Sequence, residues 1–180
     1  FNVAVGQSSL NSNTTGNRNT AIGQNALFNS TTASDNTSVG RDSLFENTTG
    51  IQNTAVGKSA MQNCSTGDSN TAVGHTALDA NTTASNNTAI GQTALESNTT
   101  GAEHFAGGAR ALSSNTTGAD NTAAGFSAVK SNTTGSYNTG FGGNALIDNT
   151  TASNNTAVGF DALSSNTTAD NNTAVGYNAL

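Results

Sequence analysis

The chain has 180 residues, a net charge of −6 and only 9% charged residues, and it contains no Pro, no Trp and one Cys. Soluble domains carry about 25% charged residues, and Leu, Ile, Val and Phe together contribute only 28 residues here. This composition excludes an ordinary globular enzyme core, a disulfide scaffold and a membrane-spanning helix of about 20 apolar residues. Five Lys and Arg residues are also too few for the basic stripe of a typical nucleic-acid binder.

A unit of 17 residues repeats along the whole chain without insertion or deletion. Its consensus is N-T-A-V-G-x-x-A-L-x-x-N-T-T-(G/A)-x-x, and its positions are numbered 1 to 17. A fixed repeat length indicates that each copy forms one coil of a regular stack. We predict one solenoid domain over residues 1–180, an interior segment of a longer fibre protein. The copies, called coils one to eleven, begin at residues 2, 19, 36, 53, 70, 87, 104, 121, 138, 155 and 172.

Two stretches of each coil are β-prone, and no stretch shows the helical period of 3.6 residues. They are Thr-Ala-Val at positions 2–4 and Asn-Thr-Thr at positions 12–14. The predicted fold is therefore all-β, a β-solenoid or β-roll of about ten and a half coils, with two short strands and two corners per coil. At about 4.8 Å per coil, parallel stacking gives a rod roughly 50 Å long.

Positions 4 and 9 are predicted to supply the core. Position 9 is apolar in every copy and position 4 is Val or Ile in eight of eleven. All 16 charged residues fall at positions 6, 7, 10, 11, 16 and 17, which are predicted to face water. The predicted core residues are Val5, Leu10, Ile22, Leu27, Val39, Leu44, Val56, Met61, Val73, Leu78, Ile90, Leu95, Leu112, Val129, Phe141, Leu146, Val158, Leu163 and Val175.

Two irregular copies place large residues beside small ones. Phe105 and Gly107 occur in coil seven, and Gly140 and Phe141 occur in coil nine. Such pairs are typical of a close-packed interior, in which one side chain fills the volume that another gives up. Neutral drift between copies is the alternative.

Position 5 is Gly in all eleven copies. An invariant Gly predicts a corner with positive φ, or a place where a neighbouring backbone comes too close for a Cβ. The second corner is expected at positions 15–17, where turn-forming residues gather. The corner glycines are Gly6, Gly23, Gly40, Gly57, Gly74, Gly91, Gly108, Gly125, Gly142, Gly159 and Gly176.

Stacked polar residues are expected to support the small core. Asn recurs at positions 1 and 12 and Thr at positions 2 and 14. In-register Asn and Thr side chains can hydrogen-bond along a stack, as they do in cross-β assemblies.

Nothing in the sequence predicts catalysis, a metal site or a cofactor, and we expect the protein not to be an enzyme. His75 lies at a variable, exposed position, and the repeat places no acid or thiol beside it or beside His104 at position 1. Cys64 replaces the usual Asn of position 12 and has no second Cys with which to form a disulfide. A nucleophile without a partner base is not activated for reaction.

Every complete copy contains an Asn-x-Ser/Thr triplet at position 11 or 12. Such a triplet is an N-glycosylation acceptor when exposed in a suitable host, although a composition rich in Asn and Thr also produces it by chance. The candidate acceptors are Asn13, Asn29, Asn47, Asn63, Asn81, Asn98, Asn115, Asn132, Asn149 and Asn166.

The unit NTAVG-xx-AL-xx-NTTG resembles the repeat tracts of phage tail-fibre-like proteins and of bacterial surface proteins that end in an endosialidase-type intramolecular chaperone. More distantly, Asn70-Thr71-Ala72-Val73-Gly74 is similar to the core motif of trimeric autotransporter adhesin heads, whose unit is shorter. The resemblance implies a homotrimeric shaft outside the cell, in a cell-surface filament or virion tail fibre.

The expected partners follow from the repeat pattern and from the resemblance. They are further copies of the chain, as a homotrimer or an end-to-end filament, and host-surface carbohydrate, with no nucleic acid and no membrane insertion. The leading function is a structural and adhesive fibre segment that holds a binding tip away from a surface. The alternatives are a self-assembling, glycosylated extracellular filament subunit and an ice-binding solenoid.

Overall fold

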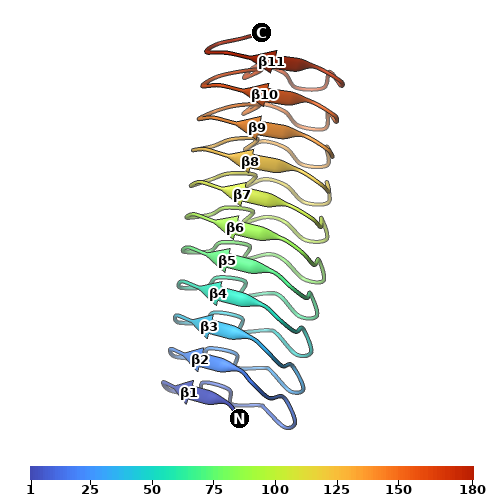
Figure 1. Cartoon of the computed structure of the whole chain (residues 1–180). Helices are drawn as coiled ribbons and strands as arrows, with labels where there is room; N and C mark the ends of the chain where they lie inside the picture. The colour runs from blue at the N-terminus through green and yellow to red at the C-terminus, as the bar shows by residue number, and fades with distance from the viewer.

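The computed structural model describes residues 1–180 as a rod of stacked coils, with the two chain ends at opposite ends of the rod (Figure 1). Each coil contributes one strand of three residues, at positions 2–4 of the repeat. The strands are β1 (Val3–Val5), β2 (Thr20–Ile22), β3 (Thr37–Val39), β4 (Thr54–Val56), β5 (Thr71–Val73), β6 (Thr88–Ile90), β7 (Phe105–Gly107), β8 (Thr122–Ala124), β9 (Thr139–Phe141), β10 (Thr156–Val158) and β11 (Thr173–Val175).

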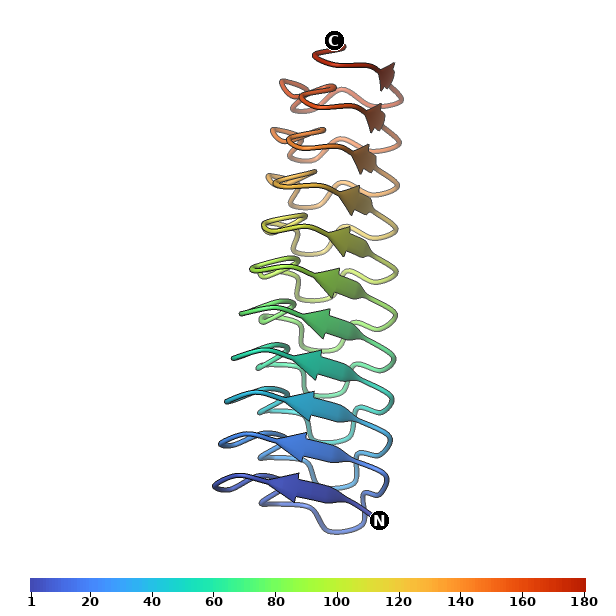
Figure 2. The ribbon, with the colours of Figure 1, turned by 60° about the vertical axis from the view of Figure 1, so that its left-hand side comes forward.

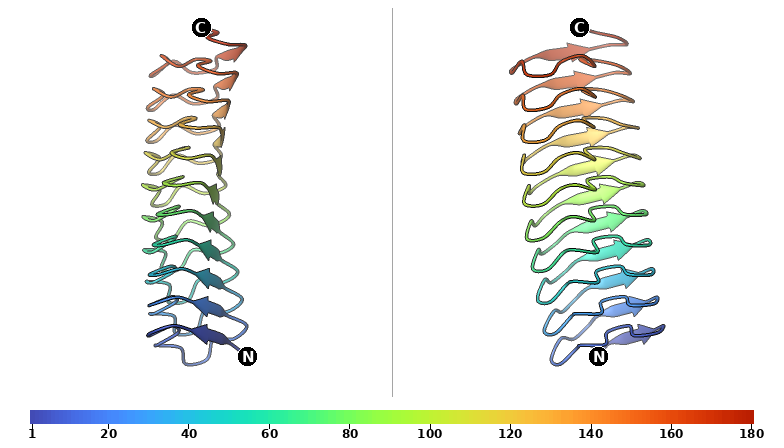
Figure 3. Two further views of the ribbon diagram at one scale, coloured as in Figure 1. Left: turned by 90° about the vertical axis from the view of Figure 1, so that its left-hand side faces the viewer. Right: turned by 180° about the vertical axis from the view of Figure 1, so that it is seen from behind.

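The eleven strands form one parallel sheet in chain order. Each residue pairs with the residue 17 positions later, as Thr71 does with Thr88 and Val73 with Ile90. Figures 2 and 3 show the strands lying over one another along one side of the rod, while the rest of each coil loops behind. The predicted all-β solenoid with parallel, in-register coils is confirmed.

The second predicted strand, at positions 12–14, does not form. The amides of two successive residues, Thr31 and Thr32, both donate to the carbonyl oxygen of Thr48 in the next coil. In a strand, successive amides point to opposite sides, so this stretch is bent rather than extended. Positions 6–11 form turns, closed by hydrogen bonds such as Ala26 N–H to Gly23 O and Ser30 N–H to Leu27 O.

Each coil holds residues other than Gly in the left-handed conformation, at positions 7, 9 and 17. In coil six these are Thr93 (φ 56°), Leu95 (φ 52°) and Glu103 (φ 63°). The conformation costs roughly 1–2 kcal/mol for a residue with a Cβ. Each of these residues donates its amide to a neighbouring coil, as Leu95 does to the carbonyl of Ala111. The stacking bonds therefore offset a backbone strain that recurs in every coil.

The apolar half of the interior is built from positions 3, 8 and 9. The small residues of positions 3 and 8 and the long residues of position 9 form one core cluster, and Leu27, Leu44, Met61, Leu78 and Leu95 are wholly buried. Leu10 in coil one is partly buried and packs against this cluster. The predicted role of position 9 is confirmed.

Position 4 does not contribute to the core, and this part of the sequence prediction was wrong. Position 3 of each strand points inward, so positions 2 and 4 must point outward because side chains alternate along a strand. Val39 is half-buried, and the other members have 36–71% of their surface exposed. The predicted core residues that lie on the outer face are Val5, Ile22, Val39, Val56, Val73, Ile90, Phe141, Val158 and Val175.

Paired substitutions confirm which positions meet inside. In coil three, Ser38 and Ser43 replace the usual Ala at positions 3 and 8, and their hydroxyl groups hydrogen-bond to each other. Where Val129 replaces Leu at position 9, Ala at position 3 of the next coil becomes Gly140. A Cβ on Gly140 would lie 2.6 Å from Cγ2 of Val129, so the β-branched side chain requires the Gly.

The polar half of the interior is built from positions 1, 12 and 15. Asn87 and Asn98 are wholly buried, and both donate an Nδ2 hydrogen to the carbonyl of Gly101, at 3.1 and 2.8 Å. The Oδ1 atom of each position-1 Asn accepts from the backbone amide of position 1 in the next coil, as Asn70 does from Asn87. The predicted Asn ladders are therefore confirmed, and they cross the interior as well as run along it.

The Thr ladder occurs at a different position from those predicted. In coils one to nine, the position-13 hydroxyl donates to the position-13 carbonyl of the next coil, as Thr99 does to Thr116 at 3.0 Å. The Thr hydroxyls at positions 2 and 14 have no protein partner in the structure, and those at position 14 are exposed in all ten copies, as Thr100 is.

Both predicted reasons for the corner glycines hold. All eleven have φ between 130° and 145°. In all but Gly176, a Cβ would lie only 2.3–2.6 Å from the carbonyl oxygen of the equivalent Gly in the next coil. The corners therefore stack too closely for any side chain.

Replacement of Gly91 by Ala should destabilise the rod by about 3 kcal/mol or more, through positive φ and overlap with Gly108. The control is Gly143→Ala at position 6, where the Cβ would meet only the movable ring of Phe160, at 3.1 Å. Thermal and urea unfolding of both variants measure the difference. Equal stability of the two variants would contradict the assigned corner geometry.

Candidate functional site

The outer face of the sheet is the surface with the strongest functional signature. It consists of the side chains at positions 2 and 4 of all eleven strands, and we call it the outward face. Position 4 alone forms the outward stripe, an apolar row along the rod. The members of the outward stripe are Val5, Ile22, Val39, Val56, Val73, Ile90, Gly107, Ala124, Phe141, Val158 and Val175.

The outward face carries no charge in any coil, because all 16 charged residues lie at other positions. Position 2 adds a row of mostly Thr side chains beside the outward stripe, and these are half-buried along most of the rod. Large exposed apolar patches mark interaction surfaces, whereas scattered apolar residues do not. Eight large apolar side chains at least 36% exposed, together with half-buried Val39, form a row of the former kind, which is interrupted only at Gly107 and Ala124.

This face escaped the sequence prediction because position 4 was assigned to the core on its hydrophobicity. The alternation of side chains along a strand was the signal that could have found it. Position 3 is almost always Ala or Ser and position 2 is Thr, so only one of the neighbouring positions 3 and 4 could lie inside.

A second surface row changes character along the rod. Position 6 carries Gln, Arg, Lys or His in coils one to six, and aromatic residues in coils eight, ten and eleven. Phe160 and Tyr177 stack with ring centroids 5.8 Å apart, and the guanidinium group of Arg110 lies 5.8 Å from the ring centroid of Phe126. All three aromatic side chains are exposed.

The two histidines occupy different environments. His75 is exposed at position 6, as expected. His104 is 2% exposed and takes the place of Asn in the interior ladder. Its Nδ1 accepts from the amide of Asn121 at 3.1 Å, and its Nε2 lies 2.7 Å from the carbonyl oxygen of Gly118. The ring is therefore neutral, with its proton on Nε2.

Burial lowers the pKa of His104 below its ordinary value of about 6.5, although the Gly118 and Asn121 bonds and the charge of Asp120 raise it in part. A proton on Nδ1 would also remove the acceptor for the Asn121 amide. No carboxylate or thiol is hydrogen-bonded to the ring, so its contacts are those of a structural residue.

Cys64 lies at position 12 in the polar half of the interior and is wholly buried. Its Sγ is 3.7 Å from the carbonyl oxygen of Gly67 and accepts from Nδ2 of Asn81 at 3.6 Å. Burial raises the pKa of the thiol, so the reactive thiolate is disfavoured. Because a thiol is a poor donor, Asn47 Oδ1 in the preceding coil is left buried without a partner.

Coil two shows the same defect. Ser30 replaces Asn at position 12, and both its hydroxyl and Oδ1 of Asn13 in coil one are buried without partners. In unbroken parts of the ladder, the equivalent Oδ1 atoms accept from Asn, as Asn98 does from Asn115 at 2.8 Å. Interruptions at position 12 therefore account for these unsatisfied atoms.

Six of the ten predicted glycosylation acceptors are wholly buried, and their Nδ2 atoms hydrogen-bond within the rod. A glycan on such an atom cannot fit in this fold, and those assignments were wrong. Asn13 and Asn166 are half-buried, and each donates Nδ2 to a position-15 carbonyl. Asn29 and Asn63, displaced to position 11, are half-buried and exposed. The buried acceptors are Asn47, Asn81, Asn98, Asn115, Asn132 and Asn149.

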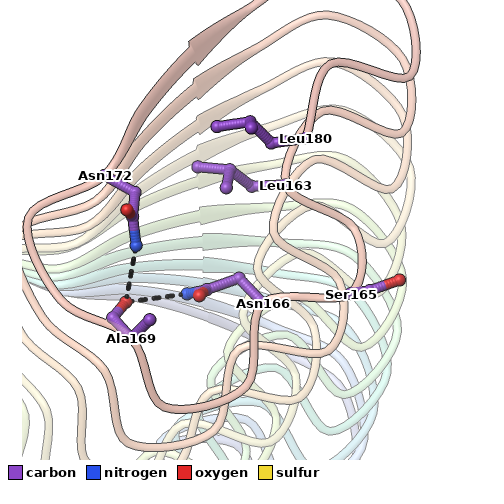
Figure 4. Close-up of a pocket in the computed structure, with 6 residues that line it drawn as sticks. All are labelled: Leu163, Ser165, Asn166, Ala169, Asn172 and Leu180. Carbon is purple, nitrogen blue, oxygen red and sulfur yellow. Dashed lines mark hydrogen bonds between the residues drawn. The ribbon is translucent and has the colours of Figure 1, made fainter.

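A cavity of about 300 Å³ lies at the C-terminal end of the rod (Figure 4). Asn166 and Asn172 point into it and both donate to the carbonyl of Ala169. Leu163 and Leu180 line its apolar side. These residues stand at positions 12, 1, 15 and 9, so the cavity is the cross-section of the interior, seen where no further coil covers it.

No group of three His, Cys, Asp or Glu side chains comes together as a metal site requires. The structure also contains no helix long and apolar enough to cross a membrane. Comparison with models of known protein families, with curated proteins and with solved structures finds no match.

Restoring Asn at position 12 should stabilise the rod. Cys64→Asn would supply the donor that Oδ1 of Asn47 lacks, and Ser30→Asn would supply the donor that Oδ1 of Asn13 lacks. Each new hydrogen bond should raise the free energy of unfolding by about 1 kcal/mol. Urea unfolding measures the gain. Ser114→Asn, at position 11 on the outside, is the control and should change stability by less than about 0.5 kcal/mol. A loss of stability in both position-12 variants would refute the ladder.

The stability of the rod should fall as the pH drops from 7.5 to 5. Unfolding lets His104 take up a proton that the folded interior disfavours, so this loss sets in below about pH 6.5 and continues toward the lowered folded pKa. His104→Asn should flatten the curve, whereas His75→Gln should not. Asp79, whose pKa is raised mainly by burial and lowered in part by the charge of His75, opposes the trend, and His104→Asn leaves the contacts of Asp79 unchanged. An unchanged pH profile in His104→Asn would rule out this role.

Proposed function

We propose that the chain is a structural and adhesive segment of an extracellular fibre, in which copies associate through the outward face. The observation that carries the proposal is the uncharged, apolar outward stripe along the whole rod. Exposed side chains of this kind gain free energy when a partner removes them from water, at about 25 cal/mol per Å².

A second copy of the same chain is the occupant that fits best. The outward face comprises 22 residues from eleven strands, all but Gly107 with a side chain, and this number is close to the roughly 20–30 residues per side of a standard protein interface. Its features recur every 17 residues, and only a partner with the same period can match them over the full length. Another copy has that period by definition.

Three copies around one axis is the assembly that the resemblance to tail-fibre and adhesin repeats implies. A closed assembly would cover the outward stripe on every copy and leave the charged positions in water. The rod then serves as a shaft that holds a binding tip away from the surface that bears it. Contact with carbohydrate along the shaft remains a prediction, and the exposed aromatic row at position 6 is where we expect it.

The other candidate functions make distinct predictions. An ice-binding solenoid would use regular rows of Thr, but the position-2 row is interrupted by Val3 and Phe105. Thermal hysteresis of a dilute solution would support that function instead. An end-to-end filament subunit would form open fibrils, visible by electron microscopy. Glycosylation remains a prediction for the accessible acceptors Asn29 and Asn63.

The proposed assembly is tested by sedimentation equilibrium and native mass spectrometry. The unaltered chain should form trimers, and the double variant Val73→Asp, Ile90→Asp should be monomeric, because each carboxylate buried in the interface costs several kcal/mol. The control Gln52→Asp, Asn86→Asp adds the same charge at exposed position 17. If the unaltered chain stays monomeric at 100 times the concentration at which the variants are compared, the proposal is overturned.

A further inference from the structure

A perfectly regular outward face cannot define how two copies align along the rod. If every coil presented Thr and Val, a copy could slide by one coil, about 4.8 Å, and make the same contacts again. Strand pairing has the same weakness when its side-chain pattern is uniform. The proposed self-association therefore needs a feature that distinguishes one axial offset from the others.

Coils seven to nine break the regularity of the outward stripe. Gly107 and Ala124 take the place of Val or Ile in coils seven and eight, and Phe141 takes it in coil nine. Phe141 has 60% of its surface exposed. The outward stripe thus has two small members followed by its largest one.

Coil seven is changed at position 2 as well. Phe105 replaces Thr, and its side chain leans over its neighbour on the outward face. A Cβ on Gly107 would lie 3.0 Å from two carbon atoms of the Phe105 ring. The ring therefore occupies part of the volume that a Val side chain fills in other coils.

The interior does not explain these changes. Gly140 is required by Val129 inside the rod, but Phe105, Gly107, Ala124 and Phe141 lie at outward positions. The expectation that Phe105 and Phe141 compensate volume in the core was wrong, since 42% and 60% of their surfaces are exposed. Their exchange of volume takes place on the surface proposed to meet another copy.

We propose that coils seven to nine, from Phe105 to Phe141, are the register key of the fibre and hold neighbouring copies at zero axial offset. The inference rests on the proposed self-association through the outward face. A closed ring of identical copies requires zero net offset, and the register key makes that offset unlike any other.

The physical reason is the pairing of aromatic rings. At zero offset, each Phe141 ring meets the Phe141 ring of its neighbour at one level, and such aromatic pairs are favoured beyond the area that they bury. At an offset of one coil, one Phe141 faces Val158 and the other faces Ala124, so the aromatic pair is lost. Between Val-lined coils, a change of offset replaces each contact by an equivalent one.

The test replaces the irregular residues of the register key, which gives a levelled variant, and measures the axial offset between copies. The levelled variant combines Phe105→Thr, Gly107→Val, Ala124→Val and Phe141→Val, each the residue usual at its position. In a Cys64→Ser background, one batch carries a label at Gln24→Cys and another carries a different label at Ser165→Cys, both at exposed sites. After co-assembly, pulsed dipolar spectroscopy between the two kinds of label reports the distance from coil two of one copy to coil ten of another.

The original chain should give one narrow distance, and the levelled variant should give several, separated by about the 4.8 Å of one coil. A control with Val56→Ile, Val73→Ile and Ile90→Val, outside the register key, should keep the single distance. Circular dichroism confirms that each variant is folded. A single distance in both the original and the levelled chains would overturn the register key while leaving self-association intact, and so would several distances in both. Monomers in every sample would overturn the proposed function itself.

Discussion

The rod depends on one constraint, which is that the chain must return to its starting point after 17 residues, one coil further along. All 117 backbone hydrogen bonds serve this closure, either within the turns of a coil or between neighbouring coils. Because every residue then lies over its equivalent, hydrogen bonds to the next coil can offset an unfavourable backbone conformation. Leu95 shows this in the left-handed region. The same stacking brings Gly91 so close to Gly108 that no side chain fits there.

Closure also explains the composition. A coil with a single three-residue strand encloses a narrow interior, which holds small residues and one long side chain on one side and buried Asn on the other. The Asn side chains satisfy the position-15 carbonyls, which accept no backbone amide. Few large aliphatic residues are needed, and charge is confined to the positions that face neither the interior nor the outward face.

The sequence was sufficient to predict the solenoid, its period, the corner glycines, the Asn ladders and the buried role of position 9, because strict repetition converts each of these into a column of identical residues. It was insufficient where the backbone leaves ordinary strand geometry. Nothing about Leu95 predicts a positive φ, and without that turn Asn-Thr-Thr is a plausible strand. The outward stripe was misassigned because Val73 was judged by its hydrophobicity alone, whereas its neighbours Ala72 and Thr71 fix its direction. The role of Phe141 depends on surface packing that composition does not reveal.

The hydrogen bonds between coils join backbone groups only 16–18 residues apart. Contacts this local allow folding to proceed without a search for distant partners. A growing chain can therefore add to the rod one coil at a time, each finished coil acting as the template for the one that follows it out of the ribosome. The length of such a rod can change by whole units during evolution without any redesign of its cross-section.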